Sequence, residues 1–161
     1  MKIEEVLQKL EDRFEIVSSD IKDDQQATVR VSKKGFLEVL AFLKHLPFEH
    51  LANIFGVDRI DEGEFEVNYN LWSYEYDLSL IVKVRISRDK PLLSTCMDLW
   101  EHAQVYEREV HEFFGIEFDG NPDLSPLFLH NWQDLPPLRK DFKTEEYSEK
   151  AFDVGTRKGE R

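Results

Sequence analysis

Cysteine is nearly absent from this chain of 161 residues, in which Cys96 stands alone. A single thiol excludes an intrachain disulfide. It also excludes an iron–sulfur cluster held by this chain alone, because such clusters normally take about four thiolates. A lone cysteine is usually a small buried hydrophobe, and we expect this of Cys96. The sequence therefore predicts no cofactor in this chain.

Positive charge is also scarce: 21 lysines and arginines stand against 33 aspartates and glutamates, for a formal net charge of −12. This balance argues against nucleic acid as a partner, because non-specific binding depends on neutralising phosphates. No apolar run approaches the ~20 residues that span a bilayer, and the first residues lack the pattern of a signal peptide. No glycine-rich phosphate loop is present either. We expect a soluble, cytoplasmic chain.

Hydrophobic periodicity predicts one α+β domain over residues 1–118. In its first part, the pattern predicts two helices and two short strands: helices at 3–10 and 36–46, strands at 14–17 and 27–31. Ser32 is a plausible N-cap of the second helix, and residues 18–26 form a polar turn. The two strands are expected to belong to the sheet, and the two helices are expected to pack on it.

The clearest alternation of apolar and polar residues lies in 64–71 and again in 78–87, which predicts an antiparallel hairpin with one wet face. A helix from about 95 to 114, ended by Gly115, is expected to cover the other face. The fold class is therefore α+β, with a mostly antiparallel sheet of about four strands and helices packed on one face.

The pattern stops near residue 119, and four of the six prolines follow. We predict an extended, proline-containing C-terminal segment over residues 119–161. It holds more large apolar side chains than a free disordered tail normally does. The segment is expected to lie on a surface, and much of that surface is expected to belong to another protein.

Three side chains on the third helix allow a competing hypothesis, a free-standing small enzyme that uses Glu107, Glu109 and His111. The alternative is a charged helix face that contacts a partner or the chain's own tail. No zinc-protease spacing is present, so a metal site is not expected. For residues 136–142, docking on a partner competes with a loop that packs back on its own domain.

Four short motifs identify a family resemblance, and they are Tyr106–Val110, Phe114–Phe118, Asn121–Leu124 and Pro137–Phe142. In order and spacing they resemble the 30 kDa subunit family of the respiratory-chain NADH dehydrogenase, complex I. This family also includes the counterparts of that subunit in membrane-bound hydrogenases. A weaker similarity extends back to about Leu51.

The resemblance implies a non-catalytic subunit of the peripheral arm, on the cytoplasmic side of the cell membrane. It is expected to pack on a large subunit related to the NiFe hydrogenases and on an iron–sulfur small subunit. The membrane subunits are reached only indirectly, and the clusters and the NiFe or quinone site lie in neighbouring subunits. The expected interface residues are Glu107, Arg108, Glu109, Glu112, Leu127, Phe128, Trp132, Pro137, Leu138, Arg139, Lys140, Asp141 and Phe142.

Departures from the family pattern indicate which branch of the family this chain resembles. The complex I branch usually has aspartate at the position of Glu112, histidine at that of Asn121, and arginines at those of Ser125 and Pro126. The resemblance therefore favours a membrane-bound hydrogenase or a related ferredoxin-linked complex. The 30 kDa subunit of a quinone-reducing NADH dehydrogenase is the alternative.

Overall fold

Seven strands and four α-helices make up residues 1–152, which are the residues that this computed structural model describes. The predicted C-terminal segment, 119–161, extends beyond them by residues 153–161. In chain order the elements are α1 (Ile3–Glu11), β1 (Ile16–Ile21), β2 (Gln26–Val31), α2 (Phe36–His45), β3 (His50–Arg59), the 3-10 helix η1 (Ile60–Glu62), β4 (Glu64–Ser73), β5 (Leu78–Ser87), β6 (Leu92–Ser94), α3 (Ala103–Phe114), β7 (Glu117–Asp119) and α4 (Thr144–Phe152).

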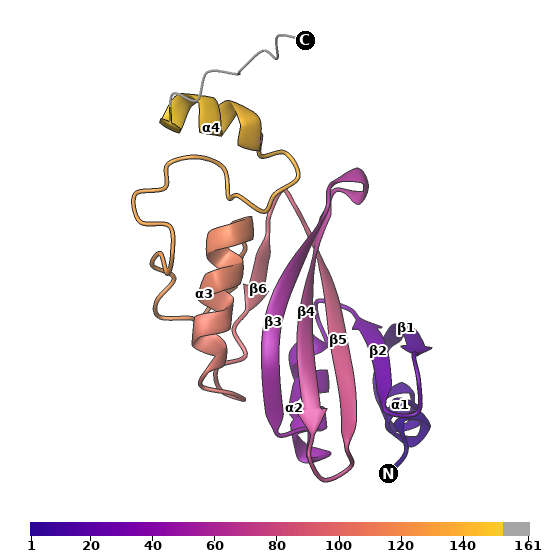
Figure 1. The fold of residues 1–161 in the computed structure, drawn as a ribbon. Helices are drawn as coiled ribbons and strands as arrows, with labels where there is room; N and C mark the ends of the chain where they lie inside the picture. Colours follow the sequence, from indigo (N-terminus) through magenta and orange to yellow (C-terminus); the bar gives the residue numbers. More distant parts are fainter. Residues whose placement is uncertain (153–161) are drawn as a thin grey trace, which may run out of the picture.

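Five strands form the main sheet, in the order β1-β2-β5-β4-β3. The neighbours pair antiparallel except β2 and β5, which run parallel. The prediction of an α+β fold with a mostly antiparallel sheet is confirmed, with one strand more than expected. Figure 1 shows β1 and α3 at opposite edges of this sheet, with the C-terminal segment beside α3.

The hairpin of β4 and β5 forms the centre of the sheet as its alternation predicts. Val67 pairs with Val84 and Tyr69 with Val82, and all four side chains are buried. Burying each such side chain contributes about 1.5–3 kcal/mol, so this face is the core of the domain.

The helices α2 and α3 cover one face of the sheet. The Phe36 ring of α2 lies 5.7 Å from the Tyr69 ring, and the Phe114 ring of α3 lies 6.1 Å from the Phe65 ring. Phe65 and Tyr69 are four residues apart on β4, so their side chains point to the same side. The expectation that helices pack on one face is confirmed.

The opposite face carries charged residues, as expected of a wet face, but they are paired rather than free. Glu66 is 4% exposed and forms ion pairs with Arg59 at 3.1 Å and with Arg85 at 3.2 Å. Burial alone raises the pKa of Glu66, but the hydrogen bonds from the two arginines outweigh it and lower the pKa below its ordinary value.

Two predictions in the first part of the chain were wrong: the bounds of the first strand and the N-cap of the second helix. The first strand begins at Ile16 and runs to Ile21, into the predicted polar turn, because β2 extends its pairing. The second helix begins at Phe36 with Gly35 at its N-cap position. Ser32 instead accepts a hydrogen bond from the Gly35 N–H at 3.4 Å, within the turn that precedes the helix.

The third predicted helix is shorter than expected and lies between the two strands of a small second sheet. The helix α3 begins at Ala103, and residues near 95 follow β6 instead. β6 pairs parallel with β7, and the Thr95 N–H donates to the Asp119 carbonyl at 2.8 Å. This pairing ties the chain before α3 to the chain after it, at the start of the predicted C-terminal segment. Among the described helices, none combines the length and apolar character needed to cross a bilayer.

Candidate functional site

The candidate site is built on α3, whose amphipathic pattern places different charged residues on different sides. Ala103, Val110 and Phe114 are buried against the domain. Gly115 ends the helix with a φ of 76°, a left-handed conformation that favours glycine. The helix is thereby fixed in place, and its charged side chains reach defined parts of the C-terminal segment.

Glu107 points inward and is 0% exposed. Its carboxylate accepts hydrogen bonds from the Thr95 hydroxyl at 2.7 Å, from the Cys96 backbone N–H at 2.9 Å and from the Asn121 side-chain amide at 2.8 Å. Three donors compensate a buried carboxylate for the loss of water. Glu107 therefore joins the chain before α3 to the start of the C-terminal segment, and its carboxylate does not reach the surface of this chain.

Cys96 lies in the same buried cluster. Burial raises the pKa of its thiol far above the ordinary value, and the neighbouring Glu107 carboxylate raises it further. A thiol in this setting is a packing group, which agrees with the expectation from the sequence.

Arg108 and Glu112 bind residues 125–129, mainly through the backbone of that stretch. The Arg108 guanidinium donates to the Ser125 carbonyl at 3.1 Å and to its hydroxyl at 3.2 Å. The Glu112 carboxylate accepts from the backbone N–H groups of Leu127 at 3.2 Å and Phe128 at 3.1 Å, and from that of Leu129. Both residues were expected at a subunit interface, and the structure places them against the chain's own tail.

The motif at 137–142 also folds back on the domain. Arg139 donates to the Asp141 carboxylate through Nε and Nη2, both at 3.0 Å, and Arg88 donates to the same carboxylate at 3.0 Å. The hydrogen bonds from Arg139 hold the pKa of Asp141 at about 2, although burial opposes them. For residues 136–142, the structure shows the alternative of a loop packed on its own domain.

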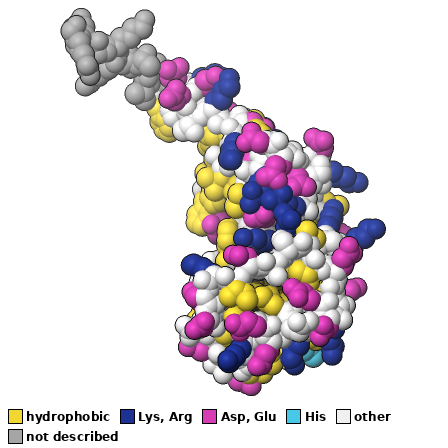
Figure 2. Space-filling view, turned by 90° about the vertical axis from the view of Figure 1, so that its right-hand side faces the viewer, with side chains coloured by type: hydrophobic (Ala, Val, Ile, Leu, Met, Phe, Trp, Pro, Cys, Tyr) yellow, Lys and Arg dark blue, Asp and Glu magenta, His cyan; other side chains and the backbone are white. Residues whose placement is uncertain are grey.

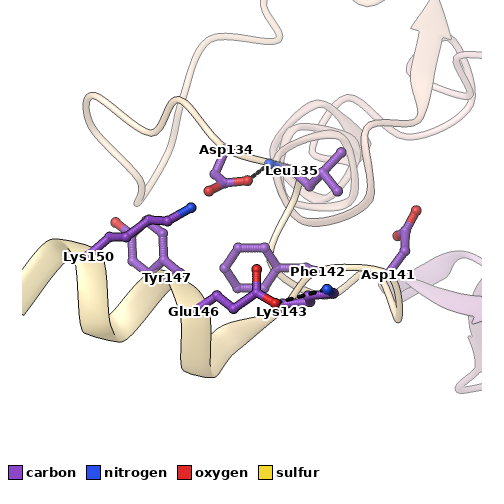
Figure 3. Close-up of a pocket in the computed structure, with 8 residues that line it drawn as sticks. All are labelled: Asp134, Leu135, Asp141, Phe142, Lys143, Glu146, Tyr147 and Lys150. Atoms are coloured by element: carbon purple, nitrogen blue, oxygen red, sulfur yellow. Dashed lines mark hydrogen bonds and ion pairs between the residues drawn. The ribbon is translucent and has the colours of Figure 1, made fainter. Parts of the chain in front are cut away.

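The end of the described segment has a small aromatic cluster of its own. The Trp132 ring lies 4.6 Å from the Tyr147 ring and 5.4 Å from the Phe142 ring. Figure 3 shows Phe142 and Tyr147 lining a pocket between α4 and the preceding loop, with Lys143 and Lys150 among its walls. The cluster packs α4 against Trp132 and Phe142 of the preceding loop rather than against the sheet.

Several apolar side chains of the segment nevertheless face outward. Phe128 is 60% exposed, Leu135 43%, Leu138 55% and Phe152 69%. Figure 2 shows hydrophobic side chains gathered along one edge of the upper half of the molecule. The segment thus uses its charged groups on its own domain and leaves apolar groups uncovered. Of the other expected interface residues, Leu127 is half-buried and Pro137 likewise, whereas Glu109 and Lys140 are exposed.

The family assignment follows from a comparison of sequences. The family model described as "Respiratory-chain NADH dehydrogenase, 30 Kd subunit" matches residues 29–148. The chain belongs to this family. The match includes the motifs on α3 and at 137–142, and it confirms the resemblance.

Relatives and solved structures agree with the assignment. The corresponding subunit of the F(420)H(2) dehydrogenase of Methanosarcina mazei is 33% identical over 146 residues, covering 86% of this chain and 90% of that protein. The fused C/D protein of the NADH-quinone oxidoreductase of Ectopseudomonas mendocina is 37% identical over 122 residues, covering 70% of this chain and 21% of that protein. A chain of the membrane-bound sulfane sulfur reductase, an archaeal respiratory membrane complex, matches with a TM-score of 0.87 and 30% identity, covering 98% of this chain and 95% of that chain.

This 30 kDa-type subunit therefore belongs to the peripheral arm of a membrane-bound oxidoreductase complex. In the part of the chain that the structure describes, Glu107, Glu109 and His111 form no hydrogen bond or ion pair with one another. Glu107 is buried, and His111 Nδ1 lies 2.9 Å from the Ile116 carbonyl oxygen. These contacts give two of the three residues structural roles.

Sequence patterns missed two residues that the site depends on, Asp58 and Arg88. Arg88 donates to Asp58 through Nε at 2.9 Å and through Nη2 at 3.0 Å. Asp58 lies on β3, which was not predicted as a strand, so no alternation marked its side chain as inward. If β3 had been recognised as a strand, the spacing of two residues from Ile54 through Gly56 to Asp58 would have placed the Asp58 side chain on the buried face.

Proposed function

We propose that this chain is a non-catalytic assembly subunit that docks on the large subunit of a membrane-bound oxidoreductase, on the cytoplasmic side of the membrane. The large subunit is expected to be of the NiFe-hydrogenase type. An iron–sulfur small subunit is the second neighbour, and the clusters and the substrate site belong to these partners. The role of this chain is to present a rigid surface that holds them together.

One observation carries the proposal: the C-terminal segment is fixed by its own domain and still exposes large apolar side chains. Leu138 and Phe128 are 55% and 60% exposed on a segment whose backbone is hydrogen-bonded to α3. Apolar groups on an ordered surface favour a protein partner, because their burial is then gained with little ordering cost.

The identity of the partner is supported by the fused relative. Its C/D designation joins two subunits in one chain, and the part that resembles this chain is 21% of its length. Two subunits that occur in one polypeptide are neighbours in that protein. By this analogy the docking partner is the separate chain that corresponds to the rest of the fused relative.

For the branch, we favour a complex of the archaeal ferredoxin-linked or hydrogenase-related kind. The similarity to the sulfane sulfur reductase chain extends over 98% of this subunit, so it includes the C-terminal segment. The alternative is a quinone-reducing complex, since a relative from an NADH-quinone oxidoreductase is 37% identical. The role of this subunit is the same in both.

A pull-down of the tagged full chain from its source membranes, with mass spectrometry of the bound proteins, tests the proposal. We expect a large subunit and an iron–sulfur subunit with the wild-type chain. The variant Phe128→Ser/Leu138→Ser is expected to lose both. The matched control is Val17→Ser/Ile21→Ser on β1, which removes apolar side chains that are 52% and 45% exposed at the opposite edge of the sheet.

Recovery of the wild-type chain without partners would contradict the docking function. Equal recovery of partners by the tail variant and the β1 control would contradict the surface on which it is placed. The co-purified membrane proteins would also decide between the two branches.

A further inference from the structure

Asp58, near the end of β3, has a carboxylate with only 1% side-chain exposure. It pairs across the sheet with Phe65, so both side chains lie on the face that α3 covers. A buried carboxylate is costly unless hydrogen bonds satisfy it. The positions of its donors therefore show what this residue holds in place.

Three N–H groups donate to Asp58, and one of them comes from the C-terminal segment. Arg88 supplies two of them, at 2.9 and 3.0 Å, and the backbone N–H of Lys140 supplies the third, at 2.8 Å. Lys140 is separated from Asp58 by 82 positions in the sequence. This long-range bond joins the segment to the end of β3.

Arg88 extends the network to Asp141, which Arg139 also binds. The guanidinium carbons of Arg88 and Arg139 lie 5.0 and 5.5 Å from the centre of the Phe65 ring, within the range of cation–π attraction. We call the five residues Asp58, Arg88, Arg139, Lys140 and Asp141 the Asp58 latch. It places two guanidinium groups over the buried ring of Phe65.

The latch fixes the position of Leu138, two residues before Lys140. The Leu138 N–H donates to the Phe113 carbonyl at 3.1 Å, while its side chain is 55% exposed. Leu138 lines a groove between β3 and α3, together with Ile54 and Phe113. The groove is thus apolar and is completed by a residue of the C-terminal segment.

We propose that Asp58 is a positioning residue for docking: through the latch it holds Leu138 at the groove between β3 and α3, where an apolar side chain of the large subunit packs. Glu109 lines the same groove, is exposed, and has no hydrogen-bond or ion-pair partner within residues 1–152. An unpaired carboxylate there favours a lysine or arginine beside that apolar side chain. This inference rests on the proposed docking function.

The experiment uses full-length chains carrying Asp58→Asn, Leu138→Ala or both. Asp58→Asn keeps the volume of the side chain but turns one acceptor into a donor that faces Arg88 and the Lys140 N–H. In the free chain, the amides of Leu138 and Lys140 are expected to exchange hydrogen about tenfold faster, while those of β4 and β5 are unchanged. Asp61→Asn is the matched control, because it removes the same charge from the exposed helix η1.

Binding to the large subunit recovered with the wild-type chain gives the second readout. Each single variant is expected to weaken binding about tenfold, and the double variant no further, because Asp58 acts through Leu138. Asp141→Asn alters the latch from the C-terminal segment and is expected to act in the same direction. If Asp58→Asn does not fold, Asp141→Asn still tests the positioning role.

Unchanged exchange at Leu138 and Lys140 in Asp58→Asn and Asp141→Asn would overturn the positioning role. Additive losses of affinity in the double variant would overturn it too. If Leu138→Ala binds like the wild type, the groove is not the docking surface. In that case the docking function is still judged by the wild-type pull-down, so the two failures are distinguishable.

Discussion

The sheet domain and the C-terminal segment of this protein are stabilised by opposite kinds of interaction: apolar burial in the domain, and hydrogen bonds to charged groups in the segment. In the sheet, apolar side chains such as Tyr69 and Leu80 are fully buried. Charged groups such as Asp141 of the segment and Glu112 of α3 hold the segment against the domain, and apolar side chains of the segment such as Phe128 face outward. The first arrangement completes a core. The second leaves apolar surface for a partner to cover.

This contrast changes which residues we assign to the interface. Glu107, Arg108, Glu112, Arg139 and Asp141 all bond within the chain, so their effect on docking is expected to be indirect. Direct contacts are expected from the exposed apolar residues of the segment. Four variants or conditions test the contrast.

The largest effect is expected from Leu80→Ala, in the centre of the sheet. Leu80 is 0% exposed, and its truncation leaves a cavity. We expect the free energy of unfolding to fall by about 2–5 kcal/mol in urea denaturation, with the segment lost in the same transition. A change below about 1 kcal/mol would contradict the assignment of this strand to the core.

The next effect is expected from Glu107→Gln, at the junction of the two regions. The new amide nitrogen must face Thr95, Cys96 or Asn121, all of which donate to the carboxylate. We expect a loss of about 1–3 kcal/mol in the free energy of unfolding. Glu109→Gln, on the exposed side of the same helix, is the control and should stay within about 0.5 kcal/mol of the wild type.

A smaller and more local effect is expected from Glu112→Gln. This change removes the negative charge that the backbone N–H groups of residues 127–129 bind. Hydrogen exchange should accelerate at these amides, while the free energy of unfolding of the sheet falls by less than about 1 kcal/mol. Loss of protection throughout β4 and β5 would show that the two regions are not separable.

The smallest effect is expected from pH. The pKa of Asp141 is lowered from 3.8 to about 2 by Arg139 and Arg88, so its ion pairs stabilise the folded state fully above pH 3.8. This stabilisation is lost as the pH falls through about 2. A carbon-detected NMR titration of the Asp141 carboxyl should give the lowered value, and Arg139→Gln should raise it. A wild-type midpoint near 3.8 would show that the ion pairs do not form.

The sequence predicted the fold best where its alternation was uninterrupted, as in β4 and β5. It missed β3 because the strand carries an irregularity between Leu51 and Asn53, which shifts the period of two. Beyond that point Phe55 and Val57 are apolar yet lie on the exposed face. A strand with a shifted register and apolar residues on both faces gives no clear periodic signal.

The motifs on α3 and at 137–142 identified residues that do form polar contacts, but the sequence left open whether a partner or the chain itself provides them. The answer depends on Asp58 and Arg88. Asp58 lies 82 positions from its partner Lys140, and Arg88 lies 53 positions from its partner Asp141. Local patterns carry no information on such distant pairs. Whether the C-terminal segment also contacts a partner stays a prediction.

The most direct test of the account is hydroxyl-radical footprinting of the full chain, free and within the complex, with mass spectrometry at Phe128 and Leu138. We predict that both side chains are oxidised readily in the free chain, where they are 60% and 55% exposed, and are protected in the complex. Tyr69, which is 0% exposed, should be protected in both states. Equal oxidation of Phe128 and Leu138 in the two states would contradict the claim that these side chains dock on a partner.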